Sequence, residues 1–452
     1  MRSRSADIQG LMVRRSSPES SATAGEPSSS PGLTPARSAF GASLVLYAAT
    51  IVTAVIWVPW DSAVAPWADL ATDQVSAFTP EQISATDAYV DDVWLASLVS
   101  WLAPTVLAII VLIVPQIRTA LARLAPRQHP ALSRFLAAAV LLAATRLATL
   151  PFALVNAQAR RDHDLLVESW STWLQRWLAE SAVVVVLGAL GVGLVLTLLQ
   201  RWRRRGWIAI VAGAVLVTLG ASAVFPFVQR LEGTAADPVL TARVLDLADS
   251  LGVDVGSVTV IETADRSPAI NAHVSGWGPT RAVTFYDTVA TTASAEEIDA
   301  LVAHELVHVR EGDVVLGTVL AALAVGATAA LVASLALSAR VRTSLRALNP
   351  GDARLVPIVI AAALVTSVIG SIAAATVSRA LEARADREAI TVTGNSEGYA
   401  NLIVCLAVTN KSTLAPSQWR YALRFTHPTP LQRLQAIEGL SAFNDLDPCG
   451  RS

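Results

Sequence analysis

Charged residues are scarce in this chain of 452 residues. Asp, Glu, Lys and Arg make up 15% of the sequence, whereas hydrophobic residues make up 53%. This balance excludes an ordinary soluble protein, which needs more polar side chains to cover its surface. The apolar residues fall into several separate blocks. We therefore predict a mainly α-helical polytopic membrane protein.

Net charge and cysteine are also low. The formal net charge is -2 at pH 7 and the arginines cluster between the apolar blocks, so no basic surface for nucleic acid is expected. The two cysteines, Cys405 and Cys449, lack the paired spacing of a metal site. A disulfide framework is not indicated either.

Composition divides the chain into five segments, which are 1–38, 39–227, 228–313, 314–377 and 378–452. The first is rich in Ser, Pro and Gly and is predicted to be a disordered basic tail. The second should hold five transmembrane helices and an acidic loop at 61–92. The fourth should hold two more transmembrane helices. We expect the third and fifth segments to form one small α+β domain.

The seven predicted spans are apolar runs long enough to cross a bilayer. They cover about 39–60, 93–114, 135–155, 181–199, 207–227, 314–337 and 355–377. Arg146 falls inside the third. An arginine at that depth is either part of a functional site or a paired structural residue, and the sequence does not separate the two.

A short α+β pattern precedes the most informative motif. Apolar residues at helical spacing predict a helix over 239–251, closed by Gly252. The β-branched run 258–261 predicts a strand. Two further strands, over 270–275 and 281–286, flank a Gly-Pro turn and predict a hairpin.

The motif itself is His304-Glu305-Leu306-Val307-His308, an HExxH. Apolar spacing and a capping box from Ser294 and Glu297 predict that it lies on a helix. Residues four apart share a helix face, so His304 and His308 can present two imidazoles to one zinc ion. Glu305 is then placed to act as general base toward a water molecule.

A catalytic zinc site needs a third protein ligand, and the segment after the seventh span supplies a candidate. Glu382 and Asp386 are four residues apart and share a helix face. Glu382 suits the third ligand, and Asp386 suits an acceptor for an imidazole N–H. The alternative is a charged helix whose carboxylates form ordinary surface ion pairs.

Several motifs in order resemble one known family. HELVH, SRALEARAD and the segment 426–433 (THPTPLQR) are similar to the type I CAAX prenyl endopeptidase and HtpX-like group of integral-membrane zinc metallopeptidases. The segments 267–276 and 283–288 are similar to the strands of that family along which a peptide lies. The similarity covers roughly residues 135–440.

The resemblance implies a gluzincin with one Zn²⁺ per chain, held by His304, His308 and Glu382. It also implies that Glu305 activates water and that Asp386 supports a ligand.

Three further roles follow from the resemblance. His427 would stabilise the oxyanion, a role that an imidazole N–H can fill in acyl hydrolysis. Asn271 would hold the substrate backbone by strand addition, unless it is a turn residue at a strand end. Arg433 would bind substrate or anchor the C-terminal segment by pairing with a carboxylate, although a surface arginine is equally plausible.

The predicted function is hydrolysis of peptide bonds in membrane-associated proteins or peptides, of the CAAX type or in membrane quality control. One alternative is a catalytically silent membrane signal transducer or scaffold with a zinc- or peptide-binding site. A transporter is the other, and the absence of an inverted repeat argues against it. The oligomeric state stays open.

Two arguments disagree on the side of the membrane that the zinc site faces in a multi-pass cell-membrane protein. The arginine-rich connections place the site outside the cytoplasm by the positive-inside rule. The family resemblance favours the cytoplasm.

Overall fold

The computed structural model describes residues 34–63, 72–124, 128–437, 443 and 446–449. Most of the basic tail that was predicted to be disordered, 1–38, lies outside the described residues. Of the described residues 34–38, those from Pro35 onward belong to helix α1 and are not disordered. Within the described part, seven helices are long and apolar enough to cross a membrane, as predicted. They are α1 (Pro35–Trp57), α3 (Pro80–Ile113), α5 (Pro130–Asp162), α6 (Trp170–Arg201), α7 (Gly206–Glu232), α11 (Asp313–Leu337) and α13 (Val356–Thr393).

Shorter elements connect and extend these helices. The shorter α-helices are α2 (Thr72–Val75), α4 (Pro115–Leu121), α8 (Pro238–Ser250), α9 (Asp287–Thr292), α10 (Ala295–Arg310), α12 (Ala339–Leu345), α14 (Ser396–Thr409), α15 (Gln418–Arg424) and α16 (Pro430–Gln435). Single 3-10 turns are η1 (Trp60–Ser62), η2 (Gly278–Thr280) and η3 (Ala353–Leu355). The strands are β1 (Thr234–Ala235), β2 (Ser257–Ile261), β3 (Ala272–Ser275) and β4 (Ala282–Tyr286).

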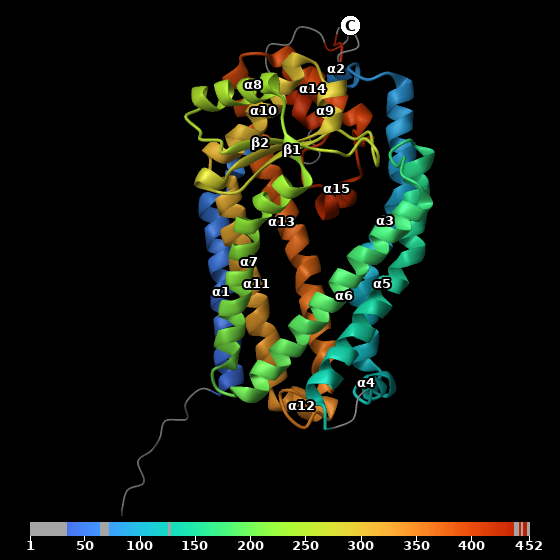
Figure 1. Cartoon of the computed structure of the whole chain (residues 1–452), viewed down its shortest axis with the longest axis vertical. Coiled ribbons are helices and arrows are strands. Elements are labelled where there is room, and N and C mark those ends of the chain that lie inside the picture. Colours follow the sequence, from blue (N-terminus) through green and yellow to red (C-terminus); the bar gives the residue numbers. More distant parts are fainter. Residues whose placement is uncertain (1–33, 64–71, 125–127, 438–442, 444–445, 450–452) are drawn as a thin grey trace, which may run out of the picture. The chain divides into compact units, whose positions relative to one another are not determined.

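The long helices pack in two groups. Helix α11 lies between α1 and α7, while α5 lies between α3 and α6. Helix α13 contacts members of both groups and continues into the layer that holds the sheet, α10 and α14 (Figure 1). The last turns of α13 therefore lie beside the HExxH helix, while its first turns lie in the apolar bundle.

The long helices extend beyond the predicted spans, and this corrects the prediction of an acidic loop at 61–92. Helix α3 already begins at Pro80 and so includes the second part of this segment, 80–92. Thr79 and Gln82 form a capping box there, which satisfies the free backbone N–H groups at the helix start. Charged side chains do not interrupt a helix, so the acidic residues continue it outside the apolar run.

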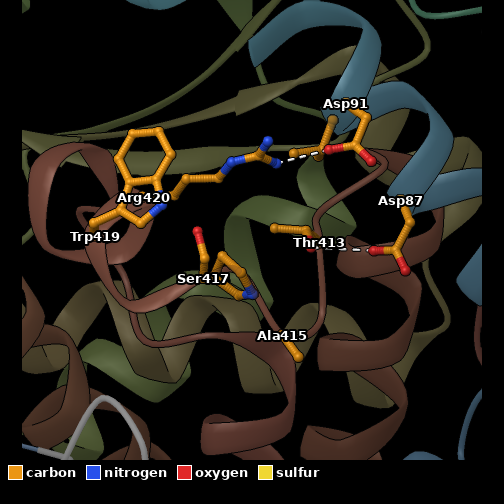
Figure 2. A pocket seen from close by; sticks show the side chains of 9 residues that line it. Asp87, Asp91, Thr413, Ala415, Ser417, Trp419 and Arg420 are labelled. Atoms are coloured by element: carbon orange, nitrogen blue, oxygen red, sulfur yellow. Dashed lines mark hydrogen bonds and ion pairs between the residues drawn. The ribbon is translucent and has the colours of Figure 1, made fainter. Parts of the chain in front are cut away.

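The extension of α3 packs on α15 and on the segment that precedes it (Figure 2). Arg420 Nη1 lies 2.7 Å from Asp91 Oδ1, and Thr413 Oγ1 donates to Asp87 Oδ1 over 3.3 Å. The Arg420 guanidinium also lies 5.0 Å from the ring centroid of Trp94. These residues line or flank a polar pocket of about 340 Å³, to which the HExxH motif does not contribute. Asp87 and Asp91, which were predicted to lie in a loop, therefore join α3 to α15 and the segment before it.

The sheet has the strand order β1-β2-β4-β3. The β3–β4 pair is antiparallel, with Val274 opposite Val283, and confirms the predicted hairpin. Strand β2 pairs with β4 in parallel, and β1, which was not predicted, pairs antiparallel with β2. Strand β3 lies at the edge, close to α10 (Figure 1).

One hydrophobic core joins the two segments that were expected to share a domain. It includes Val244 and Phe285 from the first segment and Tyr399 and Leu434 from the second, all at most 1% exposed. The apolar faces of α8, α10 and α14 all contribute to it. The two segments are thus packed as one unit although two long helices separate them in the sequence.

A disulfide joins Cys405 and Cys449, although the sequence did not indicate a disulfide framework. Cys405 lies on α14, and the chain returns to it only after 44 further residues. The spacing of the two cysteines does not predict this disulfide, because the path of the C-terminal segment decides whether they meet. The Cys449 N–H also donates to Glu297 Oε1 on α10 over 2.8 Å, so the C-terminal segment contacts the start of the HExxH helix.

Arg146 lies on α5 and is partly buried. Its Nε donates to Ser181 Oγ on α6 over 3.0 Å, and its guanidinium lies 5.6 Å from the Trp177 ring centroid. These contacts favour the structural interpretation of this arginine.

Candidate active site

Helix α10 carries the HExxH motif, as predicted. Ser294 Oγ accepts from the Glu297 N–H over 3.2 Å, and Glu297 Oε2 accepts from the Ser294 N–H over 2.6 Å. The predicted capping box is therefore formed. Leu306 is fully buried in the core, whereas His304 and His308 share the face of α10 that meets α13. The hydrophobic pattern thus fixes which way the imidazoles point.

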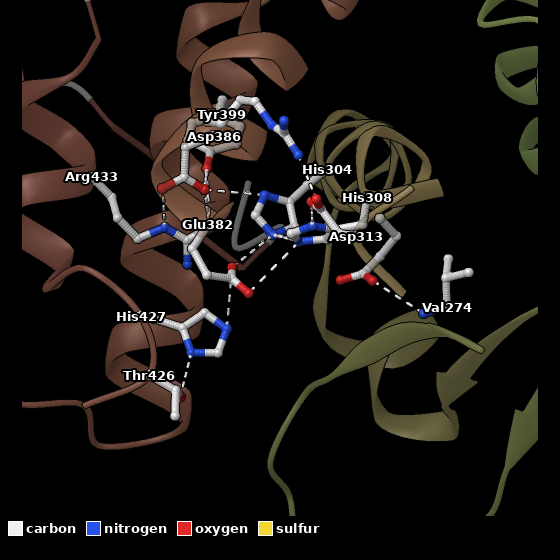
Figure 3. Close-up of polar contacts among 12 residues, drawn as sticks. Val274, His304, His308, Asp313, Glu382, Asp386, Tyr399, Thr426, His427 and Arg433 are labelled. Atoms are coloured by element: carbon white, nitrogen blue, oxygen red, sulfur yellow. Dashed lines mark hydrogen bonds and ion pairs between the residues drawn. The ribbon is translucent and has the colours of Figure 1, made fainter. Parts of the chain in front are cut away.

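Three side chains converge between α10 and α13 (Figure 3). His304 Nε2 lies 3.3 Å from His308 Nε2 and 3.1 Å from Glu382 Oε2. His308 Nε2 lies 3.7 Å from Glu382 Oε1. The three residues form a group that could hold a metal ion, with all ligand atoms within 4.8 Å of one another.

These separations suit a small divalent metal. Zinc bonds of about 2.0 to 2.1 Å at tetrahedral angles put the ligand atoms about 3.3 Å apart. The three observed separations lie near that value. Two imidazoles and one carboxylate leave one position of a tetrahedron free, which is the donor set of catalytic rather than structural zinc sites.

Asp386 supports the cluster from behind, on the next turn of α13. Its Oδ1 lies 3.1 Å from His304 Nδ1, which fits the predicted acceptor role. The Tyr399 hydroxyl donates to the same carboxylate. Burial raises the pKa of Tyr399 well above its ordinary value, so the phenol remains a donor. The Asp386 contact can fix the His304 tautomer with Nε2 toward the ligand cluster.

Arg433 has a different partner from the predicted substrate. Its side chain is 11% exposed, and its Nε and Nη2 donate to Asp386 over 3.0 and 2.7 Å. A bidentate pair of this kind occupies the guanidinium face that a substrate carboxylate would need. Arg433 therefore anchors the C-terminal segment to α13 and orients Asp386, and we no longer assign it to substrate binding or to the surface.

Asp313 plays the corresponding part for the second histidine and was not predicted. Its Oδ2 lies 2.9 Å from His308 Nδ1, and its Oδ1 accepts from Arg384 Nη2 over 2.5 Å. The sequence signal was present, because an acidic residue follows His308 by five positions. Helical spacing gave no reason to choose it, since the turn at Gly312 and not a continuous helix brings it back to the imidazole.

Glu305 follows His304 on α10 and contacts strand β3. Its Oε2 accepts from the Val274 N–H of β3 over 3.2 Å. Burial raises the pKa of the Glu305 carboxyl, although the neighbouring His304 and His308 oppose that rise. A carboxylate with a raised pKa is a stronger base, which suits a group that takes a proton from water.

The environment of His304 favours a bound cation. Burial alone would lower its pKa, but hydrogen bonds to Asp386 and Glu382 raise the pKa of His304 to about 10. The same carboxylates favour any positive charge at this place. A metal ion binding at Nε2 would have to displace the proton held there.

His427 and Asn271 lie at different distances from the cluster. His427 Nε2 lies 3.3 Å from Glu382 Oε2, and Thr426 Oγ1 lies 3.0 Å from His427 Nδ1. The His427 side chain is 54% exposed and so stays accessible beside the ligands. Asn271 stands apart from this network: its side chain is exposed where the chain enters β3.

Comparison with known proteins shows which families this chain is similar to. Residues 234–441, which include all three candidate ligands, match the family model for peptidase family M48. Over this range the chain is similar to peptidase family M48. The predicted relationship to CAAX-type and HtpX-like membrane metallopeptidases is thereby confirmed.

Individual relatives of this chain are distant. It is 32% identical over 159 residues to a protease HtpX homolog of Campylobacter curvus, covering 35% of this chain and 52% of that protein. It is 25% identical over 225 residues to CAAX prenyl protease 1 of Saccharomyces cerevisiae, covering 45% and 49% respectively. The chain thus spans about half the length of the curated relatives it matches.

A solved structure shares the fold over a longer range. The crystal structure of S. mikatae Ste24p superposes with a TM-score of 0.69 at 17% sequence identity. The match covers 90% of this chain and 100% of the Ste24p chain. The two proteins therefore share the arrangement of membrane helices and sheet, and the chain is a multi-pass membrane protein.

Proposed function

We propose that this protein is a zinc metalloendopeptidase that hydrolyses peptide bonds of membrane-associated proteins or peptides. The observation that carries the proposal is the convergence of His304, His308 and Glu382 beside a half-buried Glu305. We further propose that the segments 228–313 and 378–452 form its catalytic domain. A bound zinc ion would polarise the scissile carbonyl and make water more acidic.

The side chains around the ligands have distinct roles in this proposal. Glu305 takes the proton of the attacking water and delivers it to the leaving amine. His427, exposed beside Glu382, donates a hydrogen bond to the oxygen that becomes negatively charged. Asp386 and Asp313 hold the imidazoles of His304 and His308 in one tautomer.

The open edge of β3 supports an extended substrate. The Val274 N–H points to Glu305 and away from β4, so the backbone at this position can pair with an added strand. Asn271 at the start of β3 is proposed to hold the substrate backbone there. Strand addition binds a substrate mainly through its main-chain groups, so we expect the enzyme to accept substrates with varied side chains.

The first experiment is zinc analysis of the full chain in detergent, together with cleavage of a quenched peptide library. We expect about one zinc per chain, and cleavage that stops with a chelator and returns when zinc is added back. Zinc without any cleavage would instead favour the scaffold alternative. A chain that binds no zinc would refute the site.

We propose that the zinc site faces the extracytoplasmic side. Arginines concentrate in the α6–α7 connection and around α12, and Arg118 and Arg123 lie in and just after α4; these segments are at the end of the bundle away from the sheet (Figure 1). The positive-inside rule assigns that end to the cytoplasm. The disulfide between Cys405 and Cys449 lies in the catalytic domain, and such bonds persist in oxidising compartments. Two independent features thus outweigh the family analogy.

Labelling of intact cells tests this orientation. Ser250→Cys lies on an exposed turn of α8, and Arg204→Cys lies in the α6–α7 connection. A membrane-impermeant maleimide should label Ser250→Cys in intact cells and label Arg204→Cys only after lysis, because the membrane separates the two ends. The reverse pattern would put the zinc site in the cytoplasm.

A further inference from the structure

The last turns of helix α7 contact the β3–β4 hairpin through one helix face. Pro226, Gln229 and Arg230 follow the spacing that puts residues on the same side of a helix. The helix is one of the seven candidate membrane spans, and the hairpin includes the edge strand beside Glu305. A membrane helix and the strand at the metal site are therefore in direct contact.

Gln229 makes the central contact. Its side chain is buried, with the residue 5% exposed, and its amide bridges two residues of β3. Ser275 Oγ donates to Gln229 Oε1 over 2.7 Å, and Gln229 Nε2 donates to His273 Nε2. Alternate residues of a strand point to the same face, so one amide fixes two successive side chains of that face. Burial lowers the pKa of His273, which keeps its imidazole a neutral acceptor.

The neighbouring residues of α7 secure the same hairpin. Gly276 follows β3 with φ +82°, and a Cβ there would lie 2.8 Å from Pro226 Cγ. Arg230 Nε donates to Ser257 Oγ on β2 over 2.9 Å, and its Nη2 donates to the Thr280 carbonyl over 3.3 Å. The end of β3 therefore approaches α7 as closely as glycine permits, and Gln229 acts within a fixed docking geometry.

The backbone of β3 also contacts the candidate catalytic residue. The Val274 N–H lies between His273 and Ser275 in sequence and donates to Glu305 Oε2. A shift or rotation of the strand would move this N–H and the open edge together. The flanking contacts to Gln229 oppose such a movement, because a buried amide that lost its partners would remain unsatisfied.

We propose that Gln229 is a positioning residue through which α7 fixes the edge strand β3 and so sets the affinity for extended peptides. The proposal rests on the proposed peptidase function and adds a membrane-helix residue outside the motifs. Gln229 does not touch the ligand cluster, so its effect should appear in substrate binding by the strand and not in metal binding.

The test compares Gln229→Leu with a control on the same helix. Ser222→Ala removes the 2.9 Å hydrogen bond between α7 and Thr318 of α11 but leaves the hairpin contacts intact. For a peptide of about ten residues, Gln229→Leu should lower kcat/KM about tenfold, mainly through KM, the size expected for losing buried hydrogen bonds. A peptide of about four residues reaches only about two residues to either side of the scissile bond and so forms few pairs with β3. It should be cleaved within about twofold of the wild-type rate. Ser222→Ala should leave both peptides unaffected, and zinc content should not change.

Two results would overturn the proposal. One is an equal loss for long and short peptides, which indicates general damage, and the other is Gln229→Leu behaving like Ser222→Ala. Hydrogen exchange of the β3 amides gives a second measurement, which does not depend on peptidase activity. The amides of residues 272–275 should exchange about tenfold faster in Gln229→Leu than in wild type or Ser222→Ala, because the strand is less firmly held. Unchanged exchange contradicts the positioning role even if the protein proves not to be a peptidase.

Discussion

Glu305→Gln is expected to abolish peptide cleavage while the protein keeps its metal. The substitution preserves the size of the side chain and leaves His304, His308 and Glu382 untouched, but an amide cannot take a proton from water. General-base catalysis contributes about 10²- to 10⁴-fold, so kcat should fall by at least about 10²-fold. Zinc analysis and a continuous cleavage assay on the same preparation measure both quantities.

The matched control is Glu296→Gln. Glu296 lies on the same helix α10, in its first turn, and is exposed. The Glu296→Gln variant loses the same single charge from α10, so a loss of activity specific to Glu305→Gln cannot come from the removal of a carboxylate from this helix alone. If both variants lost activity equally, Glu305 would not be the base. If Glu305→Gln also lost its zinc, the carboxylate would be holding the metal.

Glu382→Ala is expected to lose the metal as well as the activity. Glu382 is the one candidate ligand that comes from α13, and it lies 3.1 Å from His304 Nε2 and 3.7 Å from His308 Nε2. Without it, the two imidazoles alone would have to hold the ion. We expect zinc affinity to fall by more than about 100-fold, since even residues that only support ligands account for 10- to 100-fold. Competition with a chromogenic chelator measures the change.

Glu388→Ala provides the comparison on the same helix. Glu388 follows Glu382 on α13, is partly exposed and pairs with Arg310 on α10. Its removal breaks a contact between the same two helices without touching the ligands, and an exposed ion pair contributes about 0 to 1 kcal/mol. Zinc affinity should therefore stay near the wild-type value. Tight zinc binding by Glu382→Ala would show that the third ligand lies elsewhere.

Some site residues were accessible from sequence because their partners are local. The HExxH pair needs only helical spacing, and the Ser294–Glu297 capping box defines where that helix begins. The spacing of Glu382 and Asp386 placed both carboxylates on one face of α13, as observed. These inferences depend on the geometry of a single helix, which the sequence specifies within a few residues.

Other contacts required the tertiary structure. The partner of Arg433 could not be read from its surroundings in sequence, because Asp386 lies 47 residues earlier and is brought to it by packing of the C-terminal segment on α13. The same is true of the disulfide, whose two cysteines have no characteristic spacing. The Gln229 contact with His273 crosses from a membrane helix to a strand 44 residues later.

The sequence by itself determined the membrane class, the seven spans, the hairpin and the helix that carries His304, Glu305 and His308. It did so because hydropathy over about 20 residues and helix periodicity are local properties of the chain. The tertiary structure alone decided how α13 delivers Glu382 to that helix, which carboxylate orients each imidazole, and which membrane helix holds β3. Those contacts join residues far apart in sequence, and their geometry depends on how the helices pack and not on any local pattern.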